Sequence, residues 1–277
     1  MKLKHRAGAE NCSDIFTKCL SGRSFFKHRF ALGIIKPDGL IHDLLEIQGL
    51  CLVQQGQQRT GTLAFVELCC SEFSSLRQAC EFSQIPYVGV VANIQMSGTF
   101  SRVKMVVQDW KTKRTPALWV HVHASTPCAS GSPLKGFNSN VVSQADQEWS
   151  EVIGVVPNYL VLGDSASFEL PLHNNIWSRP ETVETLDACN LVHKADVKLC
   201  KTGVSTGAGV PVGKTLRFVA NSEVFADTLH RRFSECTCKS HANLSEISFS
   251  ETAFYTRKLA LGILDGVKAA RKQRTET

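Results

Sequence analysis

Two residues with reactive side chains, Cys128 and Glu169, stand next to short apolar segments of the chain. Cys128 forms a Pro-Cys pair inside a loop rich in Ser, Gly and Pro, which places a thiol on a rigid, exposed turn. A thiolate whose pKa is lowered by its surroundings is a good carbon nucleophile. Glu169 follows after 169 − 128 = 41 residues, and in a partly apolar pocket its carboxyl group could hold or donate a proton. The pair predicts a covalent reaction at carbon.

Alternating apolar and amphipathic segments must position these two side chains. We expect strands at residues 63–68, 87–91, 117–123, 165–170 and 216–220, helices at 74–82 and 100–110, and a helical stretch at 148–161 broken at Pro157. A final helix is expected to begin near Ser250 and Glu251. This alternation predicts an α/β fold: a Rossmann-like, mostly parallel sheet with helices on both faces. Ligands then bind beyond the carboxyl ends of the strands.

Composition and charge indicate the general class of protein. Hydrophobic residues make up 43% and charged residues 20%, which favours a globular chain. The net charge of 31 − 25 = +6 suits a polyanionic partner without requiring one. We expect residues 1–60 to be a partly irregular N-terminal extension, with a helix near 40–47, and residues 61–277 to form the domain.

Eleven cysteines do not indicate a disulfide scaffold in a chain this long. The chain opens without a secretory h-region, and no stretch approaches the ~20 apolar residues of a membrane span. We therefore expect an intracellular, reducing compartment and no membrane.

The sequence around these residues resembles a known family. Thr126-Pro127-Cys128 with Ser130 and Ser132, then Phe168-Glu169-Leu170-Pro171, resembles the nucleophile loop and the glutamate strand of C5-cytosine methyltransferases. A closer resemblance is to the divergent methyltransferase-like domains found alongside retroelement polyproteins. It covers roughly residues 63–270 and rests on the segments 66–70, 119–133, 169–171 with Trp177, 213–218, 236–241 and 250–264.

The resemblance implies a cofactor, S-adenosyl-L-methionine, and a nucleic-acid substrate, DNA or RNA. Cys128 would attack C6 of a cytosine that is flipped out or unpaired, while Glu169 contacts N3. Arg217 completes the implied catalytic set, and it would hold the flipped base or its phosphate together with Lys214. The other residues implied to bind substrate are Ser130, Ser132 and Asn174. Those implied to line the cofactor are Glu67, Cys69, Ser71, Ser74, Asn93, Asp109 and Pro127.

The cofactor segment departs from the family pattern. Residues 69–76 contain no glycine, whereas the family's loop carries glycines that let the backbone approach the ligand. Asn93 stands where an acidic residue would normally bind the ribose. These departures keep an alternative open: a catalytically inactive methyltransferase-fold module that binds nucleic acid.

A second alternative is a P-loop nucleotide-binding protein, because residues 208–215 fit a relaxed Walker A pattern. A P-loop must lead into a helix, whose N-terminus holds the phosphates. Residues 216–220 are expected to be a strand instead. We therefore favour a Gly-rich hairpin that presents Lys214 and Arg217.

Histidines and cysteines could also ligate a metal. Cys236, Cys238 and His241 form a C-x-C-x-x-H segment, and Cys189, Cys200 or His230 could supply the fourth ligand that structural zinc requires. The pairing is irregular, so we favour no metal. His121 and His123 alternate on an expected strand, which favours packing histidines over ligands.

Overall fold

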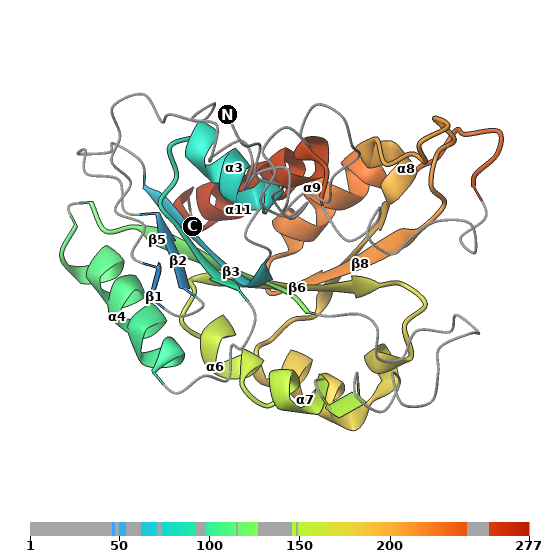
Figure 1. Ribbon diagram of the computed structural model, residues 1–277. Helices are drawn as coiled ribbons and strands as arrows, with labels where there is room; N and C mark the ends of the chain where they lie inside the picture. Colours follow the sequence, from blue (N-terminus) through green and yellow to red (C-terminus); the bar gives the residue numbers. More distant parts are fainter. Residues whose placement is uncertain are drawn as a thin grey trace, which may run out of the picture. The chain divides into compact units, whose positions relative to one another are not determined.

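An eight-stranded sheet organises the chain (Figure 1). The computed structural model describes residues 46–47, 50–53, 62–70, 74–91, 98–114, 116–126, 146–147, 149–242 and 255–276. These all belong to one compact unit that runs from Leu44 to Thr277.

Strand order and direction define the topology. The order across the sheet is β1-β2-β4-β3-β5-β6-β8-β7. The strands are β1 (Glu46–Ile47), β2 (Leu50–Val53), β3 (Leu63–Cys70), β4 (Tyr87–Val91), β5 (Trp119–Ser125), β6 (Ser165–Pro171), β7 (His193–Lys198) and β8 (Thr215–Ala220). The central strands β4, β3, β5 and β6 pair in parallel, whereas β2 and β8 run antiparallel to their neighbours. Every strand except β2 and β8 therefore runs in the same direction, and in this sense the sheet is mostly parallel.

Helices cover both faces of the sheet (Figure 1). One face packs against α4 (Thr99–Thr112), α6 (Val156–Leu160) and α7 (Pro180–Ala188) through apolar residues of alternate strand positions. The other face packs against α3 (Ser75–Phe82), α9 (Glu223–Phe233) and α11 (Arg257–Glu276). Shorter helices are η2 (Asn175–Ser178) and α8 (Leu199–Thr202). The predicted fold class, a Rossmann-like α/β sheet with helices on both faces, is confirmed.

The strands expected from the sequence are all present, with small shifts at their ends. The predicted start of the final helix was wrong, because the helix begins at Arg257 and not near Ser250. Residues 255 and 256 are not helical, and the Thr256 hydroxyl accepts a hydrogen bond from the Leu259 N–H at 3.2 Å, which caps the first turn. Residues 250–254 lie outside the described residues.

The strands at the edges of the sheet also differ from the sequence prediction. Residues 46–47, expected to end a helix, form β1, so the sheet includes strands from the segment assigned to the extension. The boundary at residue 60 stays a prediction. β7 was not predicted, because charged and polar residues interrupt its apolar pattern, as is common for edge strands.

The order in which the strands are connected indicates where a ligand would bind. From β3 the chain passes through α3 on one face to β4, and then through α4 on the other face to β5, on the far side of β3. The strand order therefore reverses at β3, with β4 on one side of it and β5 on the other, and open α/β sheets bind ligands at such a topological switch point. The carboxyl ends of β3 and β5 therefore mark this position.

Candidate functional site

Glu169 lies at the carboxyl end of β6, directly opposite Ser125, the last residue of β5. Its side chain is buried, with 6% of the residue exposed, and Oε2 accepts a 2.7 Å hydrogen bond from the Tyr255 hydroxyl. Burial raises the pKa of the Glu169 carboxyl, while the hydrogen bonds from Tyr255 and Ser125 and the charge of Lys214 act in the opposite direction. Burial thus opposes ionisation of this carboxyl group, and its hydrogen-bond donors favour it.

β5 ends at Ser125, and the segment expected to carry the nucleophile follows it in the sequence. Cys128 follows Ser125 by three positions in the sequence, but it lies outside the described residues. The same is true of other residues implied to bind cofactor or substrate, namely Ser71, Asn93, Pro127, Ser130 and Ser132. Their roles stay predictions.

Glu67 occupies the switch point on β3. Its Oε2 accepts hydrogen bonds from the Ser74 and Tyr87 hydroxyl groups, each at 2.5 Å. Burial raises the pKa of Glu67 from 4.5 to about 7, against the lowering effect of these two donors. A Cβ at Gly89 would lie 2.8 Å from the Tyr87 hydroxyl, so the glycine leaves room for this donor. Two residues implied to line the cofactor, Glu67 and Ser74, are therefore in direct contact.

The last residues of β3 include one with a strained backbone. Cys69 has φ of +58°, the left-handed conformation that glycine adopts without a steric penalty. The pairing of β3 with β4 shifts register between Leu68 and Cys70, so the irregularity lies within the strand. Ser74 caps α3 by accepting hydrogen bonds from the Leu76 and Arg77 N–H groups. Few residues separate the end of the strand at Cys70 from this cap, and none of residues 69–76 is glycine.

A chain of buried polar side chains runs along the α3, α9 and α11 face toward Glu169. The contacts run from Ser165 Oγ to His121 Nδ1 (2.6 Å), His121 Nε2 to Ser167 Oγ (2.9 Å), Ser167 Oγ to His123 Nδ1 (2.8 Å), and His123 Nε2 to Tyr255 Oη (2.9 Å). Burial lowers the pKa of both histidines, that of His123 to about 3. Both rings are therefore neutral, as expected for packing histidines, but they are also hydrogen-bonded.

These contacts allow one consistent set of donors. If Tyr255 donates to Glu169, its oxygen accepts from His123 Nε2, so the Nδ1 atom of His123 must accept from Ser167. The same reasoning makes His121 a donor at Nε2 and an acceptor from Ser165. Each group then donates once, in the direction of Glu169. The alternation of His121 and His123 on a strand was the only indication of this polar chain in the sequence. Nothing in the sequence indicated that Tyr255 takes part.

Other predicted residues lie elsewhere. Leu170, opposite Arg217, faces the α4 side of the sheet, so alternation places Arg217 on the face away from Glu169. Arg217 makes a bidentate ion pair with Asp196, with N–O distances of 2.8 and 2.9 Å. The structure therefore does not bring Arg217 to the carboxyl group of Glu169.

Two further residues have local roles in the structure. Asn174 caps η2 by accepting a hydrogen bond from the Ile176 N–H. Asp109 pairs with Lys113 on the exposed surface of α4, near the helix end that leads toward the start of β5. This position is remote from the carboxyl ends of the strands, where the residues that line the cofactor were expected.

The segment before β8 is a hairpin-like loop. Ser205 and Pro211 form an antiparallel bridge, and the Thr206 N–H donates to the Val210 carbonyl at 2.9 Å. Lys214 leads directly into β8, as the sequence predicted, and not into a helix. The P-loop alternative therefore lacks the helix N-terminus that it needs.

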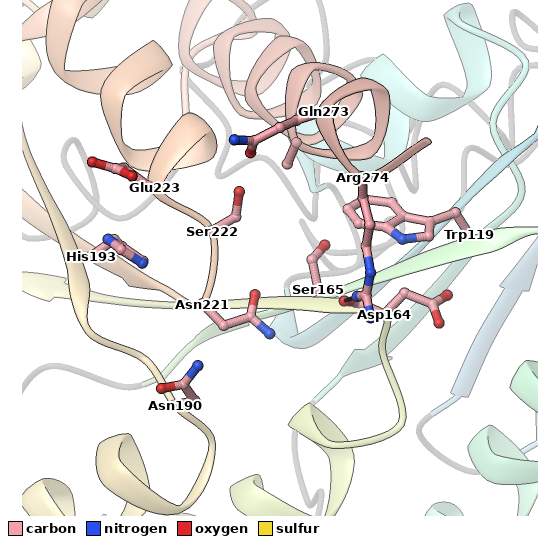
Figure 2. A pocket seen from close by; sticks show the side chains of 11 residues that line it. Trp119, Asp164, Ser165, Asn190, His193, Asn221, Ser222, Glu223, Gln273 and Arg274 are labelled. Carbon is pink, nitrogen blue, oxygen red and sulfur yellow. Dashed lines mark hydrogen bonds between the residues drawn. The ribbon is translucent and has the colours of Figure 1, made fainter. Parts of the chain in front are cut away.

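An open pocket of about 470 Å³ lies near the amino ends of the central strands, whereas Glu169 lies near the carboxyl end of β6. Figure 2 shows Trp119, Ser165 and His193, which begin three strands, together with Asn221 and Arg274 around it. The Arg274 guanidinium donates to the Asp164 carbonyl at 3.0 Å. Ser165 lines this pocket and also begins the buried polar chain, so the chain links the pocket to Glu169.

Comparisons with known proteins add little. No family model matches the chain, and no curated protein matches it. A triple mutant of DNMT2 from Spodoptera frugiperda is similar in structure, with 14% identity, a TM-score of 0.30, and coverage of 66% of this chain and 53% of that one. The chain thus spans about half of that protein. An identity and a TM-score this low carry no conclusion about activity.

No disulfide bond joins the cysteines whose side chains the structure describes. Within the described residues, no helix is long and apolar enough to cross a membrane.

Proposed function

We propose that the protein is an S-adenosyl-L-methionine-dependent methyltransferase that acts on C5 of cytosine in nucleic acid. One observation carries the proposal: Glu169, a buried carboxyl group with a raised pKa, is paired in register with Ser125, where the loop of Cys128 begins. The proposal is supported because the last residue of β5, three positions before Cys128 in the sequence, lies opposite this carboxyl group. The resemblance of both segments to C5-cytosine methyltransferases supports the same reaction.

The carboxyl end of β3, at the switch point, is where the cofactor would bind. The left-handed Cys69 supplies the backbone conformation that a glycine would supply, and Glu67 and Ser74 lie beside the N-terminus of α3. These features fit a ligand with amino and hydroxyl donors. When bound, S-adenosyl-L-methionine supplies an electrophilic methyl group. Glu67, Cys69 and Ser74 would hold it next to the base.

The protein's own groups would act on the cytosine. The Cys128 thiolate forms a bond to C6, which raises electron density at C5, and Glu169 hydrogen-bonds N3 and offsets the charge that develops there. After C5 has gained its methyl group, a base removes the C5 proton and the C6–S bond breaks, which returns the thiolate. Tyr255 orients the Glu169 carboxyl, and the chain of His123, Ser167 and His121 supplies a route for its proton.

Covalent trapping tests the proposal. A nucleic acid that contains 5-fluorocytosine cannot lose a proton from C5, so in the presence of cofactor the enzyme should remain attached to it. We expect an adduct stable to denaturing gel electrophoresis with the unmodified protein and with Cys189→Ala, a buried cysteine on the α4 face. Cys128→Ala should abolish the adduct, and Glu169→Gln should slow its formation by about 10-fold or more. An undiminished adduct in Cys128→Ala would refute the assignment.

The inactive, nucleic-acid-binding module is a second candidate. It is favoured by the contacts of Glu67, whose Oε2 already accepts two internal hydrogen bonds, and by the lack of glycine in residues 69–76. Calorimetry with S-adenosyl-L-methionine separates the two candidates. No detectable binding at millimolar ligand would remove the enzyme and leave the module.

A further inference from the structure

Four metal-ligating side chains meet at one place, far from Glu169 in the sequence. The Sγ atoms of Cys200, Cys236 and Cys238 and a ring nitrogen of His241 all lie within 4.8 Å of one another. Cys200 comes from α8, which follows β7, and the other three come from the segment after α9. The sequence offered three candidates for a fourth ligand, and the fold brings in Cys200.

The distances suit a tetrahedral metal. Cys236 Sγ lies 3.3 Å from Cys200 Sγ and 3.3 Å from His241 Nε2. Zinc with Zn–S bonds of about 2.3 Å in a tetrahedron separates two sulfur ligands by about 3.8 Å, within the span of this cluster. We propose that Cys200, Cys236, Cys238 and His241 bind one structural Zn²⁺ ion. Three thiolates and one imidazole are ligands that favour zinc over the harder Mg²⁺ and Ca²⁺.

The backbone around the cluster is arranged to hold the ligands. The Cys238 N–H donates to Cys236 Sγ at 3.3 Å, a contact that stabilises a thiolate at that position. Gly203, in the left-handed conformation, ends α8 directly after the turn that carries Cys200. A Cβ at Gly213 would lie 3.0 Å from the Cβ of His241, so the glycine lets the histidine approach the loop.

A loaded site would carry little net charge. Zn²⁺ with three thiolates and a neutral imidazole carries a net charge of −1. The sequence neighbours of the cysteines carry both signs, with Lys201 and Lys239 beside Cys200 and Cys238 and Glu235 beside Cys236. The cluster itself is half-buried at its three cysteines and exposed at His241. A closed four-ligand site of this kind is structural, because it leaves no position for substrate.

The metal would join α8 to the segment that follows α9, and both segments have further contacts nearby. Residue 242 pairs with the 211–213 loop, through the Ala242 N–H and the Pro211 carbonyl at 2.9 Å. On the other side, the Thr202 carbonyl accepts a 2.8 Å hydrogen bond from the Thr256 hydroxyl, next to Tyr255. Zinc would thus fix α8, the 211–213 loop and the start of α11 together.

Metal analysis of the purified full chain tests the proposal. We expect one zinc per chain by elemental mass spectrometry, retained through gel filtration with a mild chelator. Cys200→Ala and His241→Asn should each reduce the zinc content at least several-fold. The matched controls are Cys189→Ala and His230→Asn, the other residues the sequence offered as ligands, and both should retain full zinc.

A measurement on the unmodified chain covers the case in which the variants do not fold. Co²⁺ added to the metal-free protein should give the strong visible bands of a tetrahedral site and a thiolate charge-transfer band, with an end point of one equivalent. Zinc should displace the colour. Zinc content near zero, an octahedral cobalt spectrum, or a Cys200–Cys236 disulfide found in the freshly purified protein would each overturn the proposal.

Discussion

The hydroxyl group of Tyr255 connects Glu169 to His123, donating to the carboxyl oxygen at 2.7 Å and lying 2.9 Å from the imidazole nitrogen. Tyr255 comes immediately before α11, whereas Glu169 and His123 lie on neighbouring strands. The geometry of the carboxyl group therefore depends on a residue that is 86 positions away in the sequence.

Removing this hydroxyl should change both stability and the protonation of Glu169. In Tyr255→Phe the carboxyl group loses a donor and the Nε2 atom of His123 loses its acceptor, at a cost of about 1–3 kcal/mol of unfolding free energy. Because the hydrogen bond lowers the pKa of Glu169, that pKa should rise further in the variant. ¹³C NMR of labelled glutamate carboxyls measures it. Tyr159→Phe, on the opposite face, is the control and should leave the Glu169 signal in place.

Glu67 should make stability fall as the pH rises. Its pKa is about 7 in the folded chain and 4.5 as a free side chain, so between these values the unfolded chain releases a proton that the folded chain keeps. Denaturant unfolding of Glu67→Gln should show a gain over the parent at about pH 8 that approaches 3 kcal/mol at most, and little gain at about pH 4. Glu81→Gln on α3 is the control. An equal effect at both pH values would contradict the assignment.

His121 and His123 should make stability rise with pH, which is the opposite of the effect of Glu67. Their pKa values are lowered in the folded chain, so stability is present above the ordinary value of 6.5 and is lost as the pH falls toward about 3. ¹⁵N NMR should find both rings neutral at about pH 6, with the proton on Nε2 in each. A proton on Nδ1 of His123 would show that the polar chain does not donate toward Glu169.

Relieving the strain at Cys69 should stabilise the fold. A glycine at a position with φ of +58° avoids the penalty of a left-handed side chain, so we expect Cys69→Gly to gain about 1 kcal/mol in thermal or denaturant unfolding. Under the proposed function it should also bind S-adenosyl-L-methionine more tightly. Gln84→Gly, at φ of +55° in an exposed turn, should gain stability without any change in affinity.

The sequence predicted the central sheet well because its strands are buried on both faces and are therefore nearly continuous in apolar residues, as in β3. It also placed Glu169 at a strand end, since Pro171 closes the apolar run. It could not predict β7, whose polar residues reflect its place at the edge. Nor could it select Cys200 or Tyr255, because both act through contacts between segments that are distant in the chain.

The position of Tyr255 also determines when the site can exist during synthesis. Every strand of the sheet precedes Tyr255, so the sheet can form on a nascent chain while Glu169 still has no phenolic donor. Only when the segment ahead of α11 has emerged and docked does the carboxyl group acquire its partner. A translation product that stops after β8 would thus carry Glu169 without the hydroxyl group that donates to it in the folded chain.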